Sequence, residues 1–110
     1  MPPKYILREY HPTAREWRRW LRFRDRAIAL AALGYDAMEA FFDACAKDRR
    51  LATSCGTYAG SHSTSDRLTL EIFPWASFTR YHNPYAGTWW SVELETHDFD
   101  TRTLAEAHYG

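Results

Sequence analysis

The sequence has few cysteines, which argues against a disulfide-rich or redox scaffold. Its 110 residues include only Cys45 and Cys55, ten positions apart and without C-x-x-C spacing. Small secreted domains that rely on disulfides carry many more cysteines than this. We therefore expect both residues to be free thiols in a reducing compartment.

Long apolar runs are also missing. No run approaches the roughly 20 residues that span a bilayer, and the first ten residues, MPPKYILREY, lack the apolar stretch of a signal peptide. We expect a cytoplasmic protein that does not interact with membranes. With 45% hydrophobic and 16% aromatic residues, the chain is too apolar to be disordered, and its length fits a single compact domain, residues 1–110.

Signatures of catalysis are absent as well. No known nucleophile motif surrounds Cys55, and residues 56–61, GTYAGS, lack the Gly-Lys-Ser/Thr ending of a phosphate-binding loop. Glu95 and His97 have a spacing that some metal ligands show, but acidic strand ends are more often solvated. We therefore predict a protein that is not an enzyme and that has no metal or cofactor.

Two helices are predicted in the first half of the chain. Thr13, with Glu16 three residues later, forms a capping-box pattern, so a helix should run from about residue 14 to residue 33. Gly34 should end this helix in a left-handed conformation, and Asp36 should cap a second one. The apolar face of the second helix is formed by Met38, Phe41, Phe42 and Cys45.

The second half alternates as β-strands do. Strands are predicted at residues 4–10, 67–73, 76–81 and 88–97. The Ser-, Thr- and Gly-rich residues 53–65 are predicted to form a loop, and residues 100–109 a short helix. The order β-α-α-β-β-β predicts an α+β fold, in which a two-helix hairpin packs on one face of an antiparallel sheet of three to four strands.

The first predicted helix has an apolar side and a basic side. At about 100° per residue, the apolar stripe comprises Trp17, Trp20, Leu21, Ile28 and Ala31. Opposite it, an arc of about 100° carries Arg15, Arg18, Arg19, Arg22 and Arg26. Arg24 falls inside the apolar stripe, where we expect it to need an acidic partner such as Glu71 or Glu39.

Three interpretations of the basic side stay open at this point. It is a solvated or internally paired surface, a nucleic-acid-binding face or a contact for an acidic protein. Residues 1–30 hold eight basic and three acidic residues, whereas residues 31–110 hold six and eleven. The acidic remainder weakens the nucleic-acid interpretation. A helix-turn-helix motif is disfavoured because Ala40 and Asp43 occupy positions that need branched apolar residues.

Residues 73–90 form an unusually aromatic segment. One strand face cannot bury both Trp89 and Trp90, so one of them should lie off the main core. Tyr85, in a turn between Pro84 and Gly87, is the best candidate for an exposed aromatic side chain. Exposed Tyr and Trp are typical anchors of protein interfaces. Stacking on bases and a purely structural turn are the alternatives.

The end of the chain is acidic. Glu93, Glu95, Asp98 and Asp100 would present phosphate-like charge to a basic, nucleic-acid-handling protein. These features predict a small protein-binding module that contacts its partner through these four acids and through Tyr85, Trp89 or Trp90, Arg18, Arg19 and Arg22. Its size suggests an inhibitor from a phage or mobile element, of the anti-CRISPR class. The alternative is a nucleic-acid-binding protein that uses the arginine-rich face.

Overall fold

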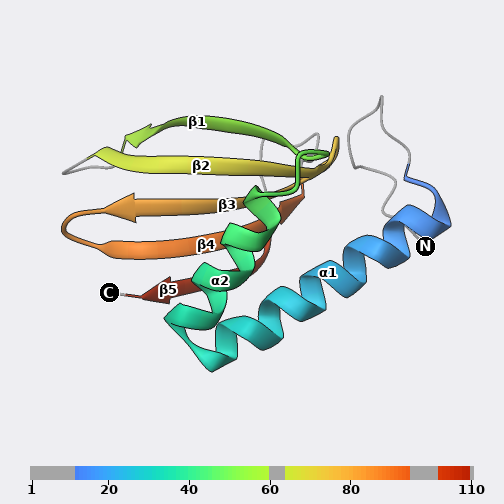
Figure 1. The fold of residues 1–110 in the computed structure, drawn as a ribbon, viewed down its shortest axis with the longest axis horizontal. Helices are drawn as coiled ribbons and strands as arrows, with labels where there is room; N and C mark the ends of the chain where they lie inside the picture. The colour runs from blue at the N-terminus through green and yellow to red at the C-terminus, as the bar shows by residue number, and fades with distance from the viewer. Residues whose placement is uncertain (1–11, 60–63, 95–101, 110) are drawn as a thin grey trace.

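The computed structural model describes residues 12–57 and 64–94 and, for the backbone alone, residues 58–59 and 102–109. Two helices precede five strands: α1 (Ala14–Leu33), α2 (Tyr35–Ala46), β1 (Ala52–Ala59), β2 (Thr64–Phe73), β3 (Ala76–Asn83), β4 (Gly87–Leu94) and β5 (Arg102–Tyr109). The strands form one antiparallel sheet in chain order, and α2 crosses one of its faces with α1 beside it (Figure 1). The predicted α+β class is confirmed, while the strand predicted at residues 4–10 lies outside the described residues.

The ends of the helices follow from local chemistry. The Thr13 hydroxyl accepts a hydrogen bond from the Glu16 backbone N–H, and the Glu16 carboxylate accepts one from the Thr13 N–H, both at 3.1 Å. This capping box and the start of α1 are as predicted. Gly34, with φ of +114°, ends α1 and directly precedes α2. The prediction that Asp36 caps α2 is therefore wrong, because α2 begins at Tyr35 and leaves Asp36 inside its first turn.

Two of the strands contradict the predictions. Residues 52–59 form the edge strand β1, paired with β2, instead of a loop. Residues 102–109 form β5, paired with β4, instead of a helix, so the sheet has five strands and not three or four. Backbone pairing with a neighbouring strand decides both cases, and it overrides the turn-like composition of β1 and the helix-forming residues of β5.

An aromatic cluster joins the helices to the sheet. Phe78 on β3 is fully buried, and its ring centroid lies 5.0 Å from that of Phe42 on α2 and 5.4 Å from that of Phe23 on α1. Trp20 on α1 meets Trp75 edge-on at 5.9 Å. Trp90, Val92 and Leu94 complete the core from β4, on the strand face predicted for them.

The apolar side of α1 differs from its prediction at three positions, Phe23, Arg24 and Ile28. Trp20 is fully buried and Trp17 half-buried, but Ile28 is 45% exposed. Phe23 takes part in the core instead, so the buried stripe is rotated toward it. Arg24 does not pair with Glu71 or Glu39. Its guanidinium forms a salt bridge with the adjacent Asp25, at 2.9 Å. Because this pair lies at the surface, the charge of Arg24 needs no buried carboxylate to compensate it.

Neither helix in the described residues combines the length and apolar character that crossing a bilayer requires.

Tyr85 and Trp90 are only five positions apart in the sequence but differ greatly in how far their side chains are buried. Trp90 is 1% exposed, so Trp90→Ala should lower the free energy of unfolding by about 3–5 kcal/mol, as expected for the loss of a large core side chain. Tyr85 is 88% exposed, and Tyr85→Ala is the matched control that should leave stability unchanged. Urea denaturation followed by tryptophan fluorescence and circular dichroism measures both. Equal stability of the two variants would contradict this assignment of the core.

Candidate partner-binding surfaces

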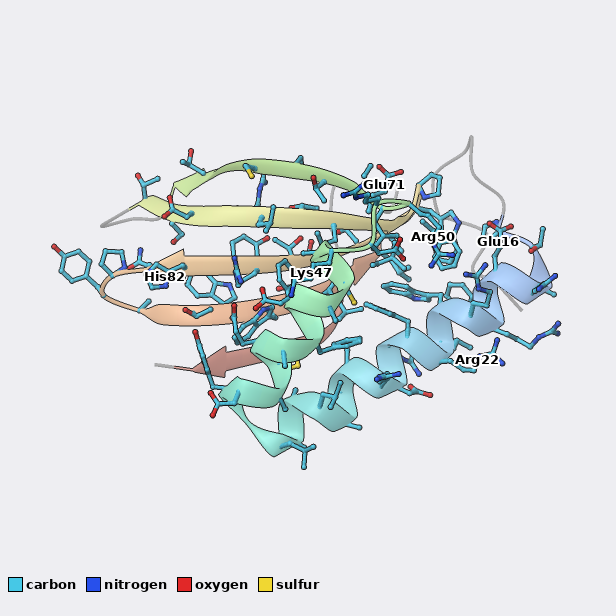
Figure 2. The ribbon with its side chains drawn as sticks, viewed as in Figure 1. Glu16, Arg22, Lys47, Arg50, Glu71 and His82 are labelled. Carbon is cyan, nitrogen blue, oxygen red and sulfur yellow. The ribbon has the colours of Figure 1, made fainter. Side chains whose placement is uncertain are left out.

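The basic side of α1 is an exposed surface. Its members are Arg15, Arg18, Arg19, Arg22 and Arg26, and Figure 2 shows Arg22 pointing away from the sheet. Among the described residues, the ion pairs involve other arginines: Arg24 with Asp25, Arg50 with Asp48, and Arg80 with Glu39 and Asp43. Internal pairing within the described part of the chain therefore does not account for the charge on this side of α1.

A groove adjoins this arginine side. It has a volume of about 610 Å³ and lies between α1, the second half of α2 and the end of β2. Its apolar lining includes Phe23, Phe41 and Ile72, and its basic lining residues are Arg19, Arg26 and Arg50. We call it the arginine groove.

Two of these guanidinium groups rest on aromatic rings. The Cζ atom of Arg19 lies 5.7 Å from the centroid of Phe73, and that of Arg26 lies 5.4 Å from the centroid of Phe41. Such cation–π contacts are worth about 0.5–1 kcal/mol at exposed sites. They also restrict long side chains that would otherwise sample many rotamers, which holds two positive charges beside the apolar lining.

Asp48 is the carboxylate in the lining of the arginine groove, and Arg50 neutralises it. Arg50 Nε donates to Asp48 Oδ1 at 3.0 Å, and Arg50 Nη2 donates to Asp48 Oδ2 at 2.9 Å. These hydrogen bonds, with one from the Arg50 backbone, lower the pKa of Asp48 to about 2. Burial raises the pKa of the neighbouring Cys45 thiol, against the opposing effect of Arg26. The lining is therefore positive overall at neutral pH.

The aromatic turn lies elsewhere on the molecule. The Asn83 side-chain oxygen accepts hydrogen bonds from the backbone N–H groups of Tyr85, at 2.8 Å, and Ala86, at 3.0 Å, and this turn leaves Tyr85 88% exposed. Trp89 is half-buried and stacks on Tyr81 at 5.1 Å, whereas Trp90 belongs to the core. Of the two tryptophans, only Trp89 is within reach of a partner. The β3–β4 turn and the N-terminal end of α1 lie at opposite ends of the molecule (Figure 1).

The predicted acidic surface is only partly described. Glu93 is half-buried on β4, on the sheet face opposite to Val92 and Leu94. Glu95, Asp98 and Asp100 lie outside the described residues. The structure therefore does not place these four acids relative to one another.

A second cleft lies between the first half of α2 and the sheet. It has a volume of about 600 Å³ and is lined among others by Glu39, Cys55, Asp66, Arg80 and His82. Arg80 Nη1 donates to Glu39 at 2.6 Å, and its guanidinium covers Phe42 at 4.8 Å, so this charge is already compensated. In the described part of the chain, no three His, Cys, Asp or Glu side chains come together to hold a metal ion.

The sequence did not reveal the arginine groove. Helical periodicity found Arg19 and Arg26, but the participation of Arg50 and Phe73 was missed. Their only sequence signal is the basic run at residues 47–50 and the aromatic residue that ends β2. Both become informative only once α1, α2 and β2 are packed together.

Comparison with protein-family models, with curated proteins and with solved structures gives no match for this chain.

The Asp48–Arg50 contact makes a prediction about ionisation. Arg50→Gln removes the charged donor, so the pKa of Asp48 should rise from about 2 toward its usual value, about 4. Because folding lowers this pKa, the pair should persist at neutral pH and be lost only as the pH falls toward 2. Carboxyl ¹³C NMR titration measures both values. Arg49→Gln is the control, and an Asp48 pKa that responds equally to both substitutions would contradict the contact.

Proposed function

We propose that the protein is a non-enzymatic binding module that holds an acidic protein partner against the arginine side of α1. The observation that carries this proposal is the row of five exposed guanidinium groups that have no carboxylate partner among the described residues. Like charges three or four positions apart on a helix destabilise it by about 0.2–0.5 kcal/mol per pair. A bound anionic surface would remove this repulsion, so the electrostatic contribution to the binding free energy would be favourable.

The arginine groove favours a protein over a nucleic acid. Its apolar lining, with Phe23, Phe41 and Ile72, suits the burial of apolar side chains, which is typical of the centre of a protein interface. A nucleic-acid backbone would use the charges but not this lining. Base stacking would need free aromatic faces, and Arg19 and Arg26 already cover one face of Phe73 and one of Phe41.

The action proposed is contact alone, in a cytoplasmic setting where both cysteines remain thiols. An inhibitor from a phage or mobile element, of the anti-CRISPR class, would act in this way on a nucleic-acid-handling complex. That class rests on the small size of the chain and its lack of catalytic motifs. It stays a prediction, as does the use of Tyr85 as a second anchor.

The proposal predicts the effect of removing charge outside the arginine groove. Arg15, Arg18 and Arg22 are exposed and do not line the groove, so changing all three to Gln should not lower the melting temperature. At about 0.5 kcal/mol for each exposed charge, the affinity for the partner should fall about tenfold. The partner would be captured from a nuclease-treated host lysate, purified, and titrated by calorimetry at several salt concentrations.

Changing the same three residues to Lys is the matched control. It keeps the charge but removes the planar, bidentate donor, so its affinity should lie between those of wild type and the Gln variant. Binding that disappears on nuclease treatment and returns with added duplex DNA would replace the protein partner with the nucleic-acid alternative. Equal binding of wild type and the Gln variant would refute both uses of the arginine side.

A further inference from the structure

Resting on the proposed function, we infer that the arginine groove docks one amphipathic acidic helix of the partner. The apolar stripe of that helix would lie on Phe23, Phe41 and Ile72, and its carboxylates would bind Arg19 and Arg26. Arg15, Arg18 and Arg22, outside the groove, would then guide the approach of the partner. The arginine groove would determine the orientation in which the partner is bound.

The spacing of the arginines matches a helix. Arg19 and Arg26 are seven residues apart on α1, two helical turns or about 10.5 Å along the axis. Arg22 lies between them on the same side. Carboxylates seven residues apart on a partner helix aligned with α1 would have the same separation. In an extended segment, side chains on one face recur every 6.6 Å or so, which does not match this interval.

Arg19 and Arg26 are already held in place. The Cζ atoms of these side chains lie over the rings of Phe73 and Phe41. Neither guanidinium has a carboxylate partner among the described residues, so an N–H edge of each is available to donate. A carboxylate accepts two parallel hydrogen bonds from such an edge. Because the side chains are restricted before binding, less conformational entropy is lost when the partner binds.

The charge and size of the arginine groove set the rest of the ligand's chemistry. Asp48 is paired with Arg50, so an incoming carboxylate would meet no uncompensated negative charge among the lining residues. A volume of about 610 Å³ accommodates a few apolar side chains, but not a folded element in full. A helix that lies across the opening and inserts one apolar stripe satisfies both limits, as in other helix-in-groove complexes.

Blocking the arginine groove tests this inference. Ala44 on α2 lines the groove and is exposed, so Ala44→Trp should fill it without disturbing the core. The probe is a synthetic 18-residue peptide with Glu seven positions apart beside a Leu stripe. Its affinity, measured by fluorescence anisotropy, should fall at least tenfold with Ala44→Trp. Ala32→Trp, at an exposed position on α1 outside the groove, should bind the peptide as wild type does.

A second pair of variants covers the case in which the bulky residue disturbs the fold. Ala44→Glu keeps a good helix former and places a carboxylate in the arginine groove, so it should repel the acidic peptide, while Ala32→Glu should not. A peptide of the same composition, rearranged so that acidic and apolar residues are mixed, should bind at least tenfold more weakly to wild type.

The outcomes separate this inference from the proposed function. Wild-type binding by both Ala44 variants, or equal binding of the two peptides, would overturn groove docking. The proposed function would still stand if the Arg15, Arg18 and Arg22 variant lost affinity for its partner. Duplex DNA that bound wild type more tightly than the peptide, and was excluded by Ala44→Trp, would overturn the inference in favour of nucleic acid.

Discussion

The packing around Phe78 is the contact on which the rest of the structure depends. This ring from β3 touches Phe23 on α1 and both Phe41 and Phe42 on α2, at centroid distances of 5.0–5.5 Å. Each aromatic pair adds about 0.5–1.5 kcal/mol to the effect of burial. The outer side of α1 carries like charges that oppose helix formation. The aromatic contacts therefore both stabilise α1 as a helix and hold it against the sheet.

The same rings that stabilise the fold shape the candidate binding surface. Phe41 packs on Phe78 toward the core and is covered by Arg26 toward solvent. Phe73 stacks on Trp75 and is covered by Arg19 in the same way. The arginine groove is thus the outer edge of the core. The rings that position Arg19 and Arg26, Phe73 and Phe41, also pack against the core and help to stabilise the fold. Tyr85 is different, since Asn83 in its own turn positions it.

Prediction from sequence succeeded where one element carries its own signal. The capping box at Thr13 and the alternation of Trp90, Val92 and Leu94 needed no knowledge of neighbours. It failed for β1 and β5, because both exist through pairing with β2 and β4 and their residues favour loop or helix when considered alone. The arginine groove could not be predicted either. Its lining comes from α1, α2, β2 and the segment between α2 and β1, and only their packing shows that Arg50 and Phe73 belong with Arg19.

Gly34 has a consequence for how this surface can change. A Cβ atom at this position would meet nothing within 4 Å, so space does not require glycine there. Glycine is favoured there because the backbone φ is +114°, a value that residues with a side chain rarely adopt. The junction between α1 and α2 therefore depends on a backbone conformation that glycine adopts readily. A substitution at this one residue would strain the point where the two helices meet, without changing any side chain that lines the arginine groove.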